Sequence, residues 1–491
     1  MPLPLSAGDM TRIRRLERVT KVVPRLTPFV YSSSSVNTNP TSTFVLACID
    51  PRFAYALEKF LDETYAQSGQ SYDLFILAGA AMGGRLTGNN VAPLGGNTVP
   101  TCGIVSATNS WQQTLFDHMQ VAITLHNVTN LVIIDHLDCG AYSACAGETP
   151  DINYTAHSSQ YTALLAIINA RNFVSNAGTA STLGSAIFTT AAGYFFDGTR
   201  TSSITNLRDY TNNVLITEPK GTNAGARVLV LGCIDPRYAS VLTSFLINYK
   251  DVQFMYDLFI TAGASIGVNQ SYVGGDVTNK RAAGVRGSYA NNILADGAAG
   301  IGNLGRNWGP TFFDHLSVAR ALHGITEVWA FDHLDCGAYK AILYGDLNAP
   351  DLNRNEHITE LRKLESMITN YAASNDPLNG SYQLSFKGFI INTSGVITNV
   401  VREGAGVELE ADYNFGSSRI RNPASTFTDS VAYSRTDYLT NTQPLQTDGG
   451  KLNGTALSLV NKTTLCDCET EKHLPRVGIL RSAVYQHSRL I

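Results

Sequence analysis

Short apolar segments alternate along the chain with longer stretches in which apolar residues recur every three or four positions. The segments FVLAC (44–48), DLFIL (73–77) and LVIID (131–135) have the length and composition of buried strands. Between them, residues 54–65 and 115–126 have the spacing of amphipathic helices. Strands that alternate with helices predict an α/β fold in which a mainly parallel sheet is flanked by helices.

The same pattern returns later in the chain. The pentapeptide CIDPR at 48–52 recurs at 233–237, and DHLDCGAY at 135–142 recurs at 332–339. The copies are offset by 185 residues (233 − 48) and 197 residues (332 − 135). An offset of this size indicates two tandem domains rather than the short repeats of a solenoid. We therefore predict a basic N-terminal arm (1–41), a first domain (42–210), a linker (211–225), a second domain (226–402) and a C-terminal extension (403–491).

Composition narrows the possible partners. Of the 491 residues, 44% are hydrophobic and 15% are charged, and the net charge is −4. This balance predicts well-formed cores and gives no reason to expect nucleic acid as a partner. No apolar run approaches the ~18 residues of a membrane span. The basic start of the chain lacks an apolar signal core, which favours a cytoplasmic or organellar location over secretion.

The eight cysteines are too sparse to predict a disulfide framework. Cys102 and Cys145 have no counterparts in the second copy, and we expect them to be small buried apolar residues. His118 and His315 recur on the helix after the inserts, where packing within the helix is expected rather than proton transfer. His157 and His357 also recur, and we expect them to be cap or surface residues.

Two thiols and one imidazole fall at predicted strand ends in each copy. Cys48 ends the first strand, and His136 and Cys139 lie three residues apart at the end of a later strand. The carboxyl ends of parallel strands meet at one edge of a sheet. Two thiolates and one imidazole suit Zn²⁺ and leave its fourth position open. The second copy repeats the set with Cys233, His333 and Cys336, so the sequence predicts two zinc sites per chain.

Each copy also carries a carboxylate and a guanidinium beside the first thiol. Asp50 stands two residues after Cys48, and Arg52 can hold it through paired hydrogen bonds. With an open fourth position, zinc would bind water and lower its pKa, and the carboxylate would help to orient that water. Alternatively, the carboxylate itself would take the fourth position and close the site. Asp235 and Arg237 repeat the pair in the second copy.

Taken together, these motifs resemble the β-class carbonic anhydrases, in which strands end in Cys-x-Asp-x-Arg, in Ala-Gly and in His-x-x-Cys-Gly. The resemblance covers about residues 42–210 and 226–402. It implies two tandem β-carbonic-anhydrase-like domains that form an internal pseudo-dimer. It further implies an enzyme, a zinc lyase that reversibly hydrates CO₂ to bicarbonate and a proton through zinc-bound hydroxide. The pairs Asp50–Arg52 and Asp235–Arg237 would be catalytic, and the weaker candidates for binding substrate are Tyr142, Tyr339, Gly79 and Gly263.

The chain departs from the family pattern at two kinds of position. Asp135 and Asp332 stand where the family has a glycine before the zinc histidine, and they are expected to affect the site electrostatically. The inserts at 82–111 and 266–310 are expected to cover the pocket, to narrow its entrance or to form an assembly surface. Two alternatives therefore stay open: a CS₂ or COS hydrolase, and a shell, filament or virion protein with closed or idle zinc sites. Homo-oligomers or larger assemblies would form through the inserts and the C-terminal extension.

Overall fold

The structure is a computed structural model, and it describes part of the chain between residues 43 and 414. The described residues are 43–66, 71–93, 102–146, 153–171, 173, 188–198, 202–222, 225–246, 252, 254–269, 271–272, 306–340, 343, 351, 353–375, 384–393, 395–402 and 407–414. The predicted N-terminal arm lies outside these residues, as do parts of both inserts and most of the predicted C-terminal extension. Residues 43–222 are called the first half below, and residues 225–414 the second half.

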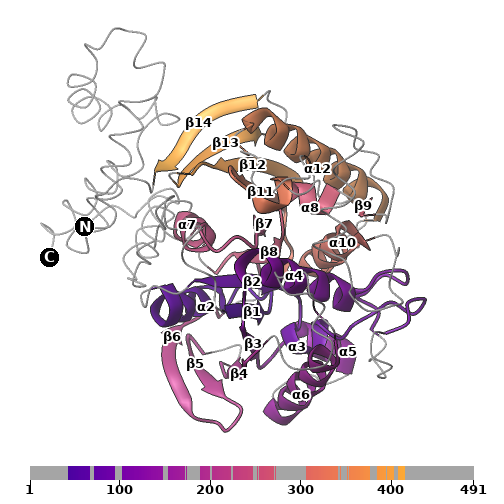
Figure 1. Cartoon of the computed structure of the whole chain (residues 1–491), viewed down its shortest axis with the longest axis vertical. Coiled ribbons are helices and arrows are strands. Elements are labelled where there is room, and N and C mark those ends of the chain that lie inside the picture. The colour runs from indigo at the N-terminus through magenta and orange to yellow at the C-terminus, as the bar shows by residue number, and fades with distance from the viewer. Residues whose placement is uncertain are drawn as a thin grey trace, which may run out of the picture.

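The fold is α/β, with one six-stranded, mixed and mainly parallel sheet in each half (Figure 1). In the first sheet the strand order is β2-β1-β3-β4-β5-β6, and the first four strands are parallel. β5 and β6 extend the sheet as antiparallel strands. The bounds are β1 Thr43–Ala47, β2 Tyr72–Ile76, β3 Asn130–His136, β4 Thr190–Phe196, β5 Ile204–Asp209 and β6 Val214–Pro219.

The second sheet has the order β8-β7-β11-β12-β13-β14, in which each strand takes the place of its counterpart in the first sheet. Its bounds are β7 Val228–Cys233, β8 Tyr256–Thr261, β11 Glu327–His333, β12 Ser385–Ile391, β13 Val396–Arg402 and β14 Val407–Asn414. A separate two-stranded ribbon joins β9 (Ser271–Tyr272) to β10 (Arg306–Asn307). β6 lies within the predicted linker and β14 within the predicted extension, so both sheets continue past the predicted domain ends.

Helices lie on both sides of the sheets. Figure 1 shows α2 and α7 to the left of the strands, with α3 to α6, α8, α10 and α12 to the right. The helix bounds are α2 Ala54–Leu61, α3 Ala80–Gly83, α4 Trp111–His126, α5 Gly140–Ala146, α6 Tyr154–Ala170, α7 Ala239–Ser244, α8 Ser265–Asn269, α10 Gly309–Val318, α11 Gly337–Tyr339 and α12 Arg354–Asn375. Single π-helical turns, η1 Asp62–Ala66 and η4 Ala319–His323, continue α2 and α10. The predicted helices at 54–65 and 115–126 are thereby confirmed.

The start of α4 illustrates how local sequence sets these bounds. The Ser110 hydroxyl caps the helix by accepting the N–H of Gln113 at 3.0 Å. The helix ends at Asn127, whose backbone is left-handed with a φ of 53°. None of the described helices is long and apolar enough to cross a membrane.

The two halves pack against each other through the edge strands β2 and β8 and through hydrogen bonds between the α4 and α10 regions. Trp111 donates its indole N–H to Asp314 at 2.9 Å, and Trp308 donates its own to Asp117 at 3.0 Å. These bonds cross from one half to the other in both directions. Both carboxylates are buried and also accept hydrogen bonds from their own surroundings, so each indole adds a donor from the other half to a buried polar group.

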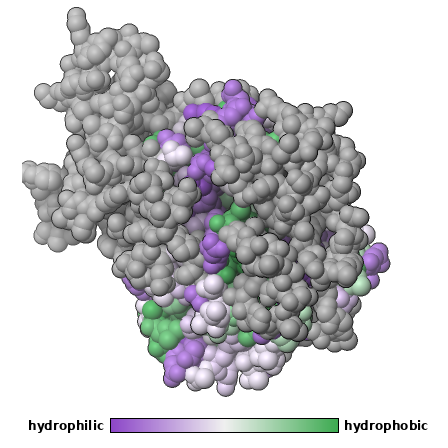
Figure 2. Space-filling model, in the orientation of Figure 1, coloured by the Kyte–Doolittle hydropathy of each residue, from purple (hydrophilic) through white to green (hydrophobic). Residues whose placement is uncertain are grey.

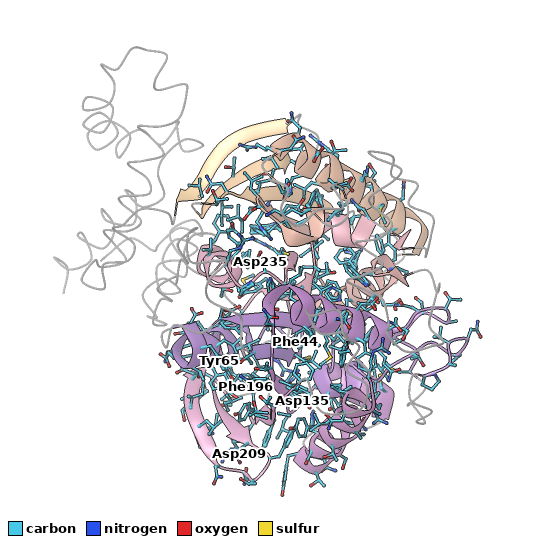
Figure 3. The ribbon with its side chains drawn as sticks, in the orientation of Figure 1. Phe44, Tyr65, Asp135, Phe196, Asp209 and Asp235 are labelled. Atoms are coloured by element: carbon cyan, nitrogen blue, oxygen red, sulfur yellow. A yellow bond between two sulfur atoms is a disulfide. The ribbon has the colours of Figure 1, made fainter. Side chains whose placement is uncertain are left out.

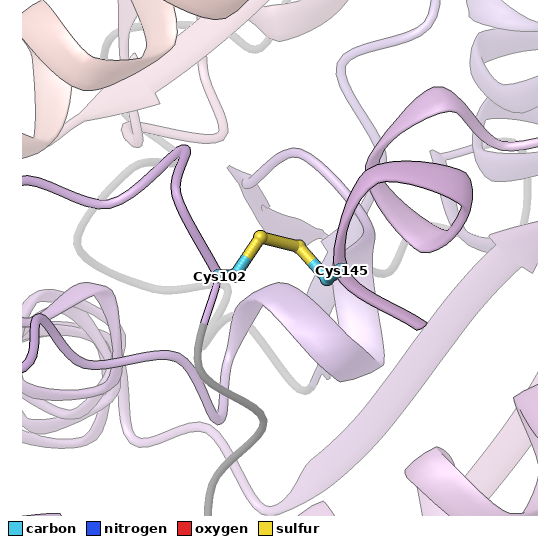
Figure 4. Close-up of a disulfide and its surroundings, with 2 residues drawn as sticks. All are labelled: Cys102 and Cys145. Carbon is cyan, nitrogen blue, oxygen red and sulfur yellow. A yellow bond between two sulfur atoms is a disulfide. The ribbon is translucent and has the colours of Figure 1, made fainter. Parts of the chain in front are cut away.

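Cys102 and Cys145 form a disulfide, with their Cα atoms 4.8 Å apart (Figure 4). The prediction that they are separate apolar residues was therefore wrong. The two residues are 43 positions apart, and nothing in the spacing indicated that they pair. The disulfide ties the first insert to α5, the helix that directly follows Cys139.

An exposed apolar patch lies at the β5–β6 end of the first sheet. Ile204, Val214 and Leu215 are 54%, 49% and 44% exposed. Figure 2 shows hydrophobic residues gathered at the lower left, where Figure 1 places β6. β6 is also the last strand of its sheet.

Candidate metal centres

The strand ends that were predicted to carry ligands lie side by side in the first sheet. β1 pairs with β3 in parallel, so the chain leaves β1 at Cys48 near the point where His136 ends β3. Cys139 follows after a turn in which Asp138 has a left-handed backbone with a φ of 60°. The ligand atoms of Cys48, His136 and Cys139 all lie within 4.8 Å of one another. These three residues are called the first centre.

The donor set of the first centre fits a tetrahedral zinc ion. Two thiolates bound to such an ion at ~2.3 Å lie about 3.8 Å apart, and the Sγ atoms of Cys48 and Cys139 are 3.9 Å apart. His136 donates its Nδ1–H to the carbonyl oxygen of Leu137 at 2.9 Å. That bond turns Nδ1 away from the thiols, so Nε2 is the ligand atom, and Nε2 is buried without a hydrogen-bond partner among the described residues.

The second half repeats this geometry with Cys233, His333 and Cys336, which are called the second centre. The Sγ atoms of Cys233 and Cys336 are 3.9 Å apart. His333 donates Nδ1–H to the carbonyl oxygen of Leu334 at 2.9 Å, and its Nε2 is buried and has no hydrogen-bond partner in the described part of the chain. The two centres therefore offer the same ligands in the same arrangement.

The predicted carboxylate–guanidinium pair is formed at the first centre. Arg52 donates to Asp50 from its backbone N at 2.9 Å, from Nε at 2.9 Å and from Nη2 at 2.6 Å. Nη1 donates to Asp138 at 2.8 Å, which ties the pair to the turn before Cys139. Oδ2 of Asp50 lies 3.7 Å from Nε2 of His136, and the carboxylate does not belong to the three-residue donor set. This arrangement favours the open site over the closed one.

The pair at the second centre has the same bonds. Arg237 donates to Asp235 from Nε at 2.9 Å and from Nη2 at 2.6 Å, and to Asp335 from Nη1 at 2.8 Å. Asp235 lies 3.7 Å from Nε2 of His333; Figure 3 labels it in the second half. Burial alone would raise the pKa of Asp235, but the charges of Arg237 and His333 hold that pKa well below its usual value. The carboxylate is therefore ionised at neutral pH.

The thiols of the first centre differ in acidity. Burial would raise the pKa of Cys48, but the hydrogen bond from the Cys139 thiol and the charge of His136 lower it well below its ordinary value. The hydrogen bond with Cys48, together with burial, raises the pKa of Cys139. Cys48 is therefore the first thiolate of the set, and a thiolate is the form that binds a metal.

Two of the weaker candidates, Gly79 and Gly263, touch the first thiolate of each centre. The Gly79 N–H donates to the Cys48 Sγ at 3.2 Å, and the Gly263 N–H donates to the Cys233 Sγ at 3.2 Å. Both glycines have left-handed backbones, with φ values of 75° and 78°. A side chain at Gly79 would also meet the Cβ of Ala141 at 3.1 Å. Glycine is therefore required here by backbone conformation and by space.

Asp135, which was expected to affect the first centre electrostatically, points into a hydrogen-bonded cluster. It accepts the N–H of Ala81 at 3.1 Å and the hydroxyls of Tyr142 at 3.2 Å and Tyr210 at 2.9 Å. His157 lies 3.6 Å away and its ring stacks on Tyr142 with 3.8 Å between centroids. Figure 3 places Asp135 among the helices on the right of the first half. A role for Tyr142 in binding substrate stays a prediction.

The second half has a matching cluster around Asp332. Tyr339 donates its hydroxyl to Asp332 at 2.6 Å, and His357 Nδ1 lies 3.5 Å from the same carboxylate. Asp351 contacts His357 at 3.2 Å and also accepts the backbone N–H of Cys336 at 2.9 Å. The prediction that His157 and His357 are cap or surface residues was wrong, because both are fully buried. The carboxylates of Asp135 and Asp332 lie within ion-pair distance of these two imidazoles.

His118 and His315 each form a hydrogen bond to the opposite half, which the sequence did not indicate. His118 accepts the backbone N–H of Ala262 at 2.8 Å, and His315 accepts that of Ala78 at 2.9 Å. Each accepting nitrogen thus holds the Ala-Gly turn of the opposite half, beside the N–H that contacts the thiolate. Burial lowers the pKa of both histidines to about 3, so they are neutral acceptors. The expectation that they pack within the fold is confirmed.

Lys220, which follows β6, is a second residue that no motif marked. It is buried, and its ammonium lies 5.8 Å from the ring centroid of Phe53. The Phe53 ring is in turn 4.6 Å from that of His136. Burial and then the charge of Arg52 lower the pKa of Lys220 to about 8. Lys220 therefore adds a second positive group beside the first centre, and it lies in the segment that was predicted to be only a linker.

In comparisons with known proteins, no family model and no curated protein matches this sequence.

Proposed function

We propose that the protein is a zinc-dependent carbonic anhydrase of the β class, with two domains in tandem that form an internal pseudo-dimer. It would reversibly hydrate CO₂ to bicarbonate and a proton at both centres. The single observation that carries this proposal is the Cys-His-Cys set that occurs twice, each time with an Asp–Arg pair 3.7 Å from the ligand histidine.

The chemistry of the donors supports zinc. Two thiolates and one imidazole match its preference for sulfur and nitrogen, and three protein ligands leave one tetrahedral position for a small molecule. When bound there, zinc supplies a Lewis acid that makes water a nucleophile near neutral pH. No other metal is needed to account for the donor set, and both centres offer it.

The protein's own groups would prepare the reaction. The Asp50 carboxylate is held by three donor groups of Arg52, so its position next to His136 is fixed before substrate arrives. An ionised carboxylate at that place accepts a hydrogen bond from the attacking water and orients its lone pair. The guanidinium cannot lose its proton, so it keeps the carboxylate in the accepting form.

The surroundings support the pseudo-dimer. Besides the matching strand orders, residues of one half stand over the centre of the other. A Cβ added at Gly140, next to Cys139, would meet Leu322 of the second half at 3.0 Å. A Cβ at Gly337, next to Cys336, would meet Leu125 of the first half at 3.2 Å. Each centre therefore borders both halves, although its ligands and its Asp–Arg pair come from one half.

The test is stopped-flow CO₂ hydration by the purified protein and by the double variant Asp50→Ala/Asp235→Ala. The variant should keep its zinc, because the three ligands are intact, but it should hydrate CO₂ at least about a hundredfold more slowly. An unchanged rate would remove the assigned role from the pairs. Faster turnover of COS or CS₂ than of CO₂ would favour the hydrolase alternative, and bound zinc without any turnover would favour the structural one.

A further inference from the structure

A small cavity between the halves is lined both by ligands of the second centre and by a carboxyl group of the first half. Cys233 and His333 line one part of it, and Glu58 on α2 lines another. The walls between them are mainly apolar: Leu74, Leu242, Leu258, Ile260, Phe331 and Ile391. Glu58 is 1% exposed, so it faces this interior space and not bulk solvent.

Glu58 shares its surroundings with a second carboxyl group. The hydroxyl of Tyr72 lies 3.2 Å from Oε2 of Glu58 and 3.1 Å from Oδ1 of Asp62. Because one hydroxyl has one proton, it can donate to one carboxylate and accept from the other group only if that group is protonated. Burial, and then the charge of Asp62, raise the pKa of Glu58 to about 8. Glu58 can therefore exchange a proton near neutral pH. The Tyr72 hydroxyl connects it to Asp62.

The elements packed against Glu58 bring no cation to it among the described residues. Thr243 on α7 donates a hydrogen bond to its carboxyl group. Tyr256 on β8 has a buried hydroxyl without a hydrogen-bond partner in the described part of the chain, and burial and Glu58 raise its pKa well above the usual value. The titratable groups around Glu58 are thus Asp62 and the phenols of Tyr72 and Tyr256, while Tyr238, Cys233 and His333 line the far part of the cavity.

The residue at the position of Glu58 differs between the two halves. Glu58 stands ten positions after Cys48, and the residue ten positions after Cys233 is Thr243. The second half therefore has a hydroxyl where the first half has a carboxyl group. Glu58 of the first half lines the cavity of the second centre. Its counterpart in the second half is a threonine, which cannot accept a proton in the same way, so the two centres differ in their nearby proton acceptors.

We propose that Glu58 is the proton-relay residue of the second centre; this inference rests on the proposed function. Hydration of CO₂ forms one C–O bond and breaks one O–H bond of water, giving bicarbonate and a proton. A water molecule that enters the cavity would take this proton and give it to the carboxylate of Glu58. Glu58 then gives its proton to the Tyr72 hydroxyl oxygen while that hydroxyl gives its own proton to Asp62, which releases it to buffer. The reverse sequence serves dehydration of bicarbonate.

The test uses chains in which one centre is disabled. Cys139→Ser leaves the second centre, and Cys336→Ser leaves the first. At low buffer concentration, Glu58→Gln should slow CO₂ hydration by the second-centre chain at least about tenfold. Its effect on the first-centre chain should be several times smaller. A small buffer such as imidazole at high concentration should restore the rate of the second-centre chain, which a merely structural defect would not allow.

A second readout needs neither zinc nor turnover. Infrared difference spectra of the metal-free protein should show a protonated carboxyl band that titrates near pH 8 and is lost in Glu58→Gln. If Glu58→Gln fails to fold, Tyr72→Phe provides the same comparison, because it breaks the relay and keeps the carboxyl group.

The possible failures are distinguishable. If the unmutated chain hydrates no CO₂, the proposed function fails and the relay falls with it. If the second-centre chain is active and Glu58→Gln leaves its rate unchanged, or slows both single-centre chains equally, the relay alone is refuted. The absence of the titrating carboxyl band would also refute it.

Discussion

Replacing His118 with alanine should damage the half of the protein that does not contain it. His118 lies on α4 of the first half, and its Nε2 accepts the N–H of Ala262 in the second half at 2.8 Å. The next residue, Gly263, donates its N–H to the Cys233 thiolate. The substitution should therefore loosen the turn that supports the second centre, while the ligands of the first centre keep their neighbours.

The expected loss can be estimated from two contributions. Leaving the buried Ala262 N–H without an acceptor costs about 1–3 kcal/mol. Removing a ring that packs 4.4 Å from Phe75 and 4.3 Å from Trp308 leaves a cavity, which costs about 2 kcal/mol more. The free energy of unfolding should therefore fall by about 3–5 kcal/mol. Because His118 is neutral in the folded protein but titrates at about 6.5 in an unfolded chain, this loss should be constant above about pH 7.5 and should shrink as the pH falls below about 6.5.

Urea unfolding would measure the stability, with Ser159→Ala on the exposed side of α6 as the control, expected to change it by less than about 0.5 kcal/mol. Zinc affinity would be measured in the two single-centre chains. It should fall about tenfold or more at the second centre and stay nearly unchanged at the first. A loss of stability below about 1 kcal/mol, or weakened zinc binding at the first centre instead of the second, would refute the reasoning.

Three further predictions concern stability. Cys102→Ser/Cys145→Ser should lower the free energy of unfolding by about 3–4 kcal/mol, because a 43-residue separation is closed; a reductant should lower the wild type equally, and equal stability with and without it would contradict this. Burial would lower the pKa of His323, but its aspartate partner on β8 raises it to about 9. This contribution to stability is complete below about pH 6.5 and is lost as the pH rises through about 9, so His323→Gln should flatten the fall seen in alkaline urea titrations, and an unaltered slope would argue against the ion pair. Gly79→Ala should cost about 1–2 kcal/mol and Gly263→Ala more, because its added Cβ would meet Ile266 at 2.6 Å; calorimetry that finds both harmless would count against a strict need for glycine.

The sequence was most informative about features that depend on local spacing or on the ends of parallel strands. The periodicity of the apolar segments predicted the strands that lead to Cys48 and His136, and the spacing of the repeats predicted two ligand sets. The bonds between Asp50 and Arg52 followed from their separation by one residue. In each case the relation is local, or it depends on the rule that parallel strands bring their carboxyl ends to one edge.

Relations between distant segments could not be predicted in the same way. The disulfide of Cys102 depends on how an insert folds back on α5, and no periodicity records that path. The burial of His157 depends on the carboxylate of Asp135, which comes from another element. β6 lies in the stretch between the two predicted domains, which was assigned to a linker, and it is largely exposed at the end of its sheet, where packing imposes little sequence pattern. The crossing of His118 to Ala262 likewise appears only once the halves are packed together.

The most direct test of the account combines a metal count with an activity measurement on one preparation. Metal analysis and X-ray absorption should find two zinc ions per chain, each with two sulfur ligands and one imidazole, and the same sample should hydrate CO₂ between about pH 6 and pH 9. Loss of one zinc and part of the rate in either single-centre chain would complete the expected result. Zinc-free protein, or two bound zinc ions with no CO₂ hydration anywhere in this range, would contradict the account.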